Sequence, residues 1–235
     1  MSISIFVFVR IAGLCFVIAA GLSMAYGIAK ISNSSSGLAV SILIIVSSVF
    51  GFFTSSILIL FPHFLVEPIL SSSWLLTRVP GLFATLLLMA RTIVIWSTSP
   101  PNLPDAVIAT LVLLTIGSAC FLGASWLGFL SAICLRNQPG CFLLRLFQLT
   151  TMVLLAVGAV TFQISSTLIN SPGNYITRVF LLLTITFFGI CCTDALLIVA
   201  TSFIVIGVLS LWCMAIRVAI LVDQGEPPPW TNQLN

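Results

Sequence analysis

The chain has 235 residues, of which 60% are hydrophobic and 6% are charged, and its formal net charge is +3. A mean hydropathy of +1.28 excludes an ordinary soluble domain, and the scattered basic residues give no patch for a nucleic-acid partner. Apolar runs of about 20 residues recur along the sequence, and each is long enough to cross a bilayer. We therefore expect an all-α, polytopic transmembrane helix bundle that sits in a membrane, with the lipid bilayer as its first partner.

The apolar runs predict about seven spans, within a range of six to eight. The first five are Ile11–Ala29, Leu38–Phe61, Gly81–Trp96, Ala106–Leu135 and Phe142–Ile169. The first is interpreted as an uncleaved helix, although Ser23-Met24-Ala25 has small residues where a signal peptidase would cut. Between the second and third runs, the proline-containing segment His63–Pro80 is less apolar, and we predict a surface-lying or re-entrant piece.

The stretch Tyr175–Val222 is too long for one span and requires two helices with a tight turn. A turn at Cys192–Asp194 keeps the Asp194 carboxylate out of the centre of a helix, where inserting it into the membrane would cost about 2.5–3.5 kcal/mol. It also lets Thr193 or Asp194 cap the last helix. A turn at Ala200–Ser202 is the alternative and would leave Asp194 buried. Residues 1–222 are thus one transmembrane domain, and residues 223–235 are a short solvated tail.

The basic residues divide equally between the two predicted sides, so the positive-inside rule gives a weak signal. We choose a cytoplasmic N-terminus. In this orientation the basic residues on the inner side lie nearer to loops than those on the outer side do. The inner residues are then Arg10, Arg78, Arg136 and Arg145. The outer residues are then Lys30, Arg91, Arg178 and Arg217.

Small residues recur every three or four positions on three of the predicted helices. Lipid gives helices no hydrophobic reason to associate, so such residues mark places where two backbones approach closely. They face either other helices of this chain or another membrane subunit, including a second copy of the chain. The residues concerned are Gly117, Cys120, Ala124, Gly128 and Ala132 in the fourth run, Ser47, Gly51 and Ser55 in the second, and Gly21, Ala25 and Ala29 in the first.

Charged residues inside apolar runs are candidates for function, because bilayers tolerate them poorly. Asp194 with Arg91, Arg145 or Arg10 forms either a proton-relay or transport site or a structural ion pair. Arg145 and Gln148 share a helix face with Thr151, which either lines a polar cavity or makes hydrogen bonds between helices.

Cysteine, lysine and histidine usage narrows the chemistry. Cys134 and Cys141 flank a short loop beside arginine and are candidates for palmitoylation, with plain packing as the alternative. The single lysine, Lys30, excludes a retinal-type Schiff base in the last helix, and the single histidine, His63, excludes haem held by two histidines. We expect no metal, no cofactor and no enzymatic activity.

Residues 6–135 resemble the four-span MARVEL-type membrane proteins. The features that carry the resemblance are Arg10 opening the first helix, Gly21-Leu22-Ser23 late in it, a short polar turn, and Ala124-Ser125-Trp126-Leu127 in the fourth helix. The three further spans expected after Cys141 depart from that pattern. The resemblance implies a role in organising a membrane or in trafficking.

Two hypotheses for function remain. The first is a non-catalytic multi-pass membrane protein that organises a membrane or serves as a subunit of a larger assembly. The second is a small carrier or channel that uses Asp194 and the intramembrane arginines.

Overall fold

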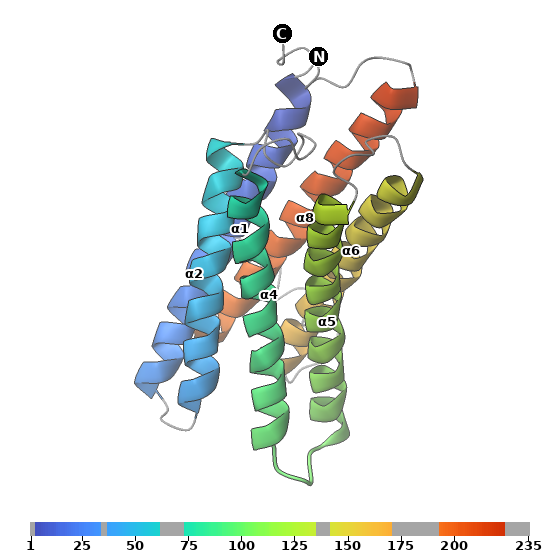
Figure 1. The fold of residues 1–235 in the computed structure, drawn as a ribbon. Helices are drawn as coiled ribbons and strands as arrows, with labels where there is room; N and C mark the ends of the chain where they lie inside the picture. Colours follow the sequence, from blue (N-terminus) through green and yellow to red (C-terminus); the bar gives the residue numbers. More distant parts are fainter. Residues whose placement is uncertain (1–2, 34–36, 62–72, 135–141, 171–192, 224–235) are drawn as a thin grey trace.

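The computed structural model describes residues 3–33, 37–61, 73–134, 142–170 and 193–223. These residues form six helices and no strand, which confirms the predicted all-α fold class (Figure 1). The helices are α1 (Ile3–Asn33), α2 (Leu38–Leu60), α4 (Ser73–Thr98), α5 (Asp105–Cys134), α6 (Phe142–Asn170) and α8 (Thr193–Asp223).

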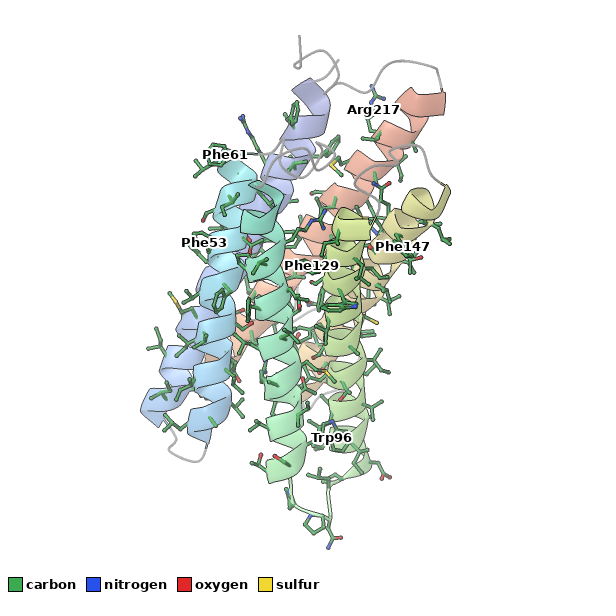
Figure 2. The ribbon with its side chains drawn as sticks, viewed as in Figure 1. Phe53, Phe61, Trp96, Phe129, Phe147 and Arg217 are labelled. Carbon is green, nitrogen blue, oxygen red and sulfur yellow. The ribbon has the colours of Figure 1, made fainter. Side chains whose placement is uncertain are left out.

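Each of the six helices contains a segment long and apolar enough to cross a membrane, from 21 residues in Arg78–Thr98 to 26 residues in Phe6–Ile31. Large apolar side chains are exposed on the outside of the bundle, among them Phe53 of α2 and Leu209 of α8 (Figure 2). Soluble proteins rarely expose continuous apolar surface, whereas acyl chains cover it. The chain therefore has the architecture of a multi-pass membrane protein.

The six helices form a closed ring (Figure 1). α1 packs against α2 and α8, and the ring continues through α4, α5 and α6 back to α8. Neighbouring helices run antiparallel, so α1 begins and α8 ends at the same end of the bundle: Val9 near the start of α1 packs against Met214 near the end of α8. The ring thus encloses an interior to which every helix can contribute side chains.

Small residues at seven-residue intervals join α1 to α2. A Cβ on Gly13 would lie 3.2 Å from the carbonyl oxygen of Ser55, and a Cβ on Gly27 would lie 3.2 Å from that of Ser41. These two close approaches show that α1 and α2 run antiparallel, with Gly13 level with Ser55 and Gly27 level with Ser41. A seven-residue repeat keeps one seam of two helices in contact along their length. The full seam is Gly13, Ala20 and Gly27 against Ser55, Ser48 and Ser41.

A second seam with the same spacing joins α5 to α6. The Ser165 hydroxyl donates a hydrogen bond to the carbonyl oxygen of Thr110 across this interface, at 3.2 Å. Two helical turns further along α5, the backbone of Gly117 contacts the backbone of Gly158 in α6. The seam comprises Thr110, Gly117 and Ala124 against Ser165, Gly158 and Thr151.

Apolar side chains fill the middle of the ring. Phe121 of α5 and Phe162 of α6 meet edge to face with their ring centroids 6.2 Å apart. Leu114 and Val208 complete the buried cluster with Ala159, and Phe16 of α1 packs against it. We call these five buried residues the apolar core; it contacts five of the six helices through its partly buried neighbours.

The structure corrects two predicted boundaries. α4 begins at Ser73 and contains Pro80, so residues 73–80 are part of a spanning helix and not a surface-lying or re-entrant piece. A proline in the first turns of a helix removes one backbone donor without ending the helix when the surroundings hold it. α8 runs without a break from Thr193 to Asp223, which overturns the alternative turn at Ala200–Ser202 and agrees with a turn before Asp194. The sixth predicted span, from Tyr175 to the turn at Cys192–Asp194, lies outside the described residues.

The side predicted for Arg217 is also wrong relative to Arg10. Arg217 lies on the last turns of α8, at the end of the bundle where α1 begins (Figure 2). The prediction counted six spans before α8, an even number that places the end of α8 on the side opposite the start of α1, whereas the two pack side by side. Arg10, Arg78 and Arg217 therefore share one end of the bundle, and Lys30 lies at the other.

Candidate functional site

Buried polar side chains from all six helices lie inside the ring. In a bilayer, each of them needs a partner within the protein, because lipid offers no hydrogen bonds. We call this set the inner polar cluster. It comprises Tyr26, Ser41, Arg91, Thr92, Ser118, Gln163, Ser166, Thr201 and Ser202.

Two hydroxyl pairs of the cluster join neighbouring helices. Thr92 of α4 lies 2.9 Å from Ser118 of α5, and Ser166 of α6 lies 2.9 Å from Thr201 of α8, measured between the hydroxyl oxygens. Each of these hydroxyls is also within hydrogen-bond distance of a carbonyl of its own helix. A hydroxyl has one hydrogen, so in each pair one hydroxyl donates along its helix while the other donates across. The pairs thus hold α4 to α5 and α6 to α8.

One of the two polar groups of the Gln163 side chain forms a hydrogen bond. Its amide nitrogen donates to the Ser202 hydroxyl of α8 at 3.2 Å, while its amide oxygen is buried without a hydrogen bond. The Ser41 hydroxyl oxygen is in the same condition. A buried polar atom that lacks a partner costs about 1–3 kcal/mol, so both atoms are positions where a water or a ligand would gain a bond.

Arg91 is the charged member of the cluster. It is 7% exposed, and its Nε is buried without a hydrogen bond. Tyr26 of α1 lies near enough to interact with it electrostatically, although α1 and α4 are not neighbours in the ring. Arg91 is seven residues from the end of α4 at Thr98, or about 10 Å along the axis, which puts its backbone well inside the bilayer.

No carboxylate that the structure describes neutralises Arg91. Among the acidic residues, the side chain of Asp105 is described, and it is exposed in the first turn of α5. An arginine at the centre of a helix costs about 2.5–3.5 kcal/mol to place in a membrane. Arg91 is therefore retained at a cost, which makes it the strongest candidate for function in the described part of the chain.

The described side chains predicted to form an intramembrane site with Arg91 do not gather around it. Arg10 and Gln148 are exposed on the outer faces of α1 and α6. Arg145 and Asp194 lie in the first turns of α6 and α8, at opposite ends of the bundle, and their side chains lie outside the described part. Of the five candidates, the described side chains leave Arg91 alone in the interior.

The small residues predicted to pack helices in the second and fourth runs lie at interfaces within the chain. The Ser47 hydroxyl of α2 donates to the carbonyl of Ala84 in α4 at 3.0 Å, and Gly51 lies next to Ala20 of α1. Cys120 contacts the position of a Cβ on Gly158, as does the Gly117 carbonyl. Ser55, Ala124 and Gly128 are also buried. The side chains of Ala132 and Cys134 and the whole of Cys141 lie outside the described residues.

Sequence reasoning missed most of the inner polar cluster. Tyr26, Ser41 and Gln163 were not singled out, because single hydroxyls and amides are common in apolar runs. A signal was nevertheless present: Ser41, Ser48 and Ser55 recur at intervals of seven, as do Gly13, Ala20 and Gly27. Such a repeat marks an inward seam better than a four-residue stripe does.

No family model, no curated protein and no solved structure matches this chain. The resemblance of residues 6–135 to MARVEL-type proteins therefore stays a prediction. In this ring α1 closes against α8, whereas an isolated four-span bundle would have to close α1 against α5.

Proposed function

We propose that the chain is a non-catalytic carrier or channel that binds a small anion at Arg91 inside its helix ring. The observation that carries the proposal is an arginine that is 7% exposed, whose backbone lies about 10 Å from the end of a spanning helix and whose Nε has no hydrogen-bond partner. Ionisable residues at such depth are rare, and in transporters and pumps they mark solute or ion pathways.

The surroundings of Arg91 suit a small oxyanion or halide. A guanidinium presents up to five donors in a plane, and the Nε of Arg91 has no hydrogen bond in the described part of the chain. The other members of the inner polar cluster provide hydroxyls from neighbouring helices. The apolar core, with Leu88 of α4 packed against it, separates this region from the end of the bundle where α1 begins. A barrier of this kind is what a carrier must open during transport.

An assembly role has less support from the geometry. It was expected from the small-residue stripes, and those of the second and fourth runs that are described pack against other helices of the same chain. The exposed faces that remain are rich in Phe, Leu and Ile, which lipid covers without a partner protein.

Anion flux in proteoliposomes tests the proposal. Purified protein would be reconstituted and the efflux of chloride, nitrate, phosphate and acetate measured separately. We expect flux of at least one of these anions above that of protein-free vesicles, and a loss of about tenfold or more in Arg91→Met, the loss of one charge-assisted hydrogen bond. Arg10→Met, which removes an exposed arginine, is the matched control and should keep wild-type flux. Equal flux in wild type and Arg91→Met would refute the proposal.

A further inference from the structure

A second arginine of α4 lies in the wall of a cavity near the other end of the ring. The cavity has a volume of about 160 Å³ and is lined by α2, α4, α5 and α6. Because α2 and α6 are not neighbours, the cavity lies within the ring and not in a groove between two helices. Its walls include Thr54, Leu58, Arg78, Ser125, Thr151 and Leu155.

Gly128 makes room for the Arg78 guanidinium. A Cβ at position 128 would lie 2.6 Å from Nη1 of Arg78 and 3.6 Å from its Cζ, so the guanidinium rests directly on the backbone of α5. A Cβ there would require the guanidinium, at the end of a flexible side chain, to move from this position. The absence of a side chain on the facing helix thus lets the cation lie at the cavity wall.

The Arg78 cation has no counter-charge in the cavity. Its described lining contains hydroxyl and apolar groups but no carboxylate. The Thr54 and Thr151 hydroxyls donate to carbonyls of their own helices, at 2.9 and 2.8 Å, which leaves their lone pairs to accept. Arg78 and Ser125 are therefore the groups able to donate to a bound anion, and Leu58 and Leu155 offer it apolar contact.

Arg78 lies near one end of the spanning helix α4, where lipid phosphates are found. It is five residues after the start of the helix at Ser73, or about 7.5 Å along the axis. The same end of the bundle carries Arg10 and Arg217, which the positive-inside rule assigns to the cytoplasmic face. Basic pockets between membrane helices on that face bind the head groups of anionic lipids, and guanidinium matches phosphate geometry by two parallel hydrogen bonds.

We propose that the Arg78 cavity is a binding site for a phosphate group, carried by an anionic phospholipid or by a small phosphorylated solute. This site is separate from Arg91 and does not depend on the transport proposed there. The lipid is favoured by the mostly apolar wall and the interfacial depth.

Binding by the purified full chain in detergent tests the site. The probes are dioctanoyl phosphatidylglycerol, dioctanoyl phosphatidylcholine as the zwitterionic control, glycerol 3-phosphate and inorganic phosphate, each titrated by native mass spectrometry and by the shift in melting temperature. We expect saturable binding of at least one anionic phosphate, and affinity about tenfold weaker in Arg78→Gln, the loss of one charge-assisted hydrogen bond. If phosphatidylglycerol binds and neither glycerol 3-phosphate nor phosphate binds, the phosphate group belongs to a lipid. If glycerol 3-phosphate or phosphate binds and phosphatidylglycerol does not, it belongs to a solute.

Gly128→Ala separates position from charge. It keeps the arginine but places a methyl group where Nη1 lies, and should weaken binding as Arg78→Gln does. Gly21→Ala and Arg217→Gln are the controls: a Cβ on Gly21 meets nothing within 4 Å, and Arg217 lies at the same end on α8. Both should bind as wild type does.

Three results would overturn the proposal. These are no preference of the wild type for anionic phosphate over phosphatidylcholine, unchanged affinity in Arg78→Gln or Gly128→Ala, and equal loss in the two controls. If the variants fail to fold, photo-crosslinking of a phosphatidylglycerol analogue to the wild type decides. Label on the helix segments around the cavity supports the site, and label confined to other segments refutes it.

Discussion

Gly117 of α5 and Gly158 of α6 lie in direct backbone contact. A Cβ on Gly117 would lie 3.3 Å from the carbonyl oxygen of Gly158, and a Cβ on Gly158 would lie 3.2 Å from that of Gly117. Helices in lipid gain most of their association energy from such close packing. This reciprocal contact lets Phe121 and Phe162 meet nearby and brings the Ser165 hydroxyl of α6 within hydrogen-bond distance of the Thr110 carbonyl of α5.

Leucine at either glycine should therefore separate the two helices. We expect Gly117→Leu and Gly158→Leu each to destabilise the bundle by about 1–3 kcal/mol, the usual cost of overpacking. Gly21→Leu is the matched control, since a Cβ there meets nothing within 4 Å, and should change stability by no more than about 0.5 kcal/mol. Thermal unfolding in detergent, followed by tryptophan fluorescence, measures all three. A Gly117→Leu variant as stable as Gly21→Leu would show that α5 and α6 do not meet at these residues.

The sequence predicted the fold class and most helix bounds, because apolar runs of spanning length require helices in a bilayer. Leu38–Phe61 and Phe142–Ile169 were predicted within one residue of α2 and α6. Pro80 misled the prediction for α4, since a proline among apolar residues looks like a break when the packing around it is unknown. The order of the helices in the ring could not be predicted either, because no local sequence pattern indicates that α1 packs against α8.

Of the residues predicted to form the candidate site, the structure describes one, Arg91, as buried. Arg10 and Gln148 are also polar residues in apolar runs, so from the sequence they had the same standing as Arg91. In the structure both are exposed. The direction in which a residue faces depends on the rotation of its helix, which the partners set. The sequence placed Gly128 at a helix interface, but it gave no sign that Arg78 of α4 is the residue that lies against it.

The hydrogen bond between Thr92 and Ser118 should couple α4 to α5 by a measurable amount. In a double-mutant cycle of Thr92→Val and Ser118→Ala, we expect a coupling free energy of about 0.6 kcal/mol, the average for hydrogen bonds between membrane helices, and no more than about 1.7 kcal/mol. The bond is buried and 2.9 Å long, which places it toward the upper part of this range.

Ser56 provides the control for that cycle. Its hydroxyl bonds to the carbonyl of Phe52 in its own helix and is exposed. A cycle that pairs Ser56→Ala with Ser118→Ala should give no coupling. Equal coupling in the two cycles would mean that the Thr92–Ser118 contact contributes nothing specific.

Arg91→Met should leave the protein as stable as the wild type or more stable. A buried cation without a partner loses hydration and regains little, so an apolar residue of similar length is accommodated at less cost. We expect an unchanged or higher melting temperature, with Arg217→Met, near the end of α8, as the reference for removing a peripheral arginine. A loss of about 3–5 kcal/mol would instead reveal a structural ion pair with a carboxylate, and would support the pairing of Arg91 with Asp194 predicted from the sequence.

The start of α1 and the end of α8 should lie on the same side of the membrane, and that side should be the cytoplasm. The six described helices alternate in direction around the ring, and Phe8 near the start of α1 packs close to Val218 near the end of α8. Four arginines of the described helices, Arg10, Arg78, Arg145 and Arg217, lie toward this end, and Lys30 and Arg91 lie toward the other, which the positive-inside rule reads as a cytoplasmic N-terminus. Fusions of green fluorescent protein and of alkaline phosphatase to each terminus, expressed in bacteria, measure the two sides independently. We expect fluorescence and no phosphatase activity at both termini. Phosphatase activity at the C-terminus alone would establish an odd number of crossings, and with it a seventh span; activity at both termini would invert the bundle and place the Arg78 cavity in the outer leaflet.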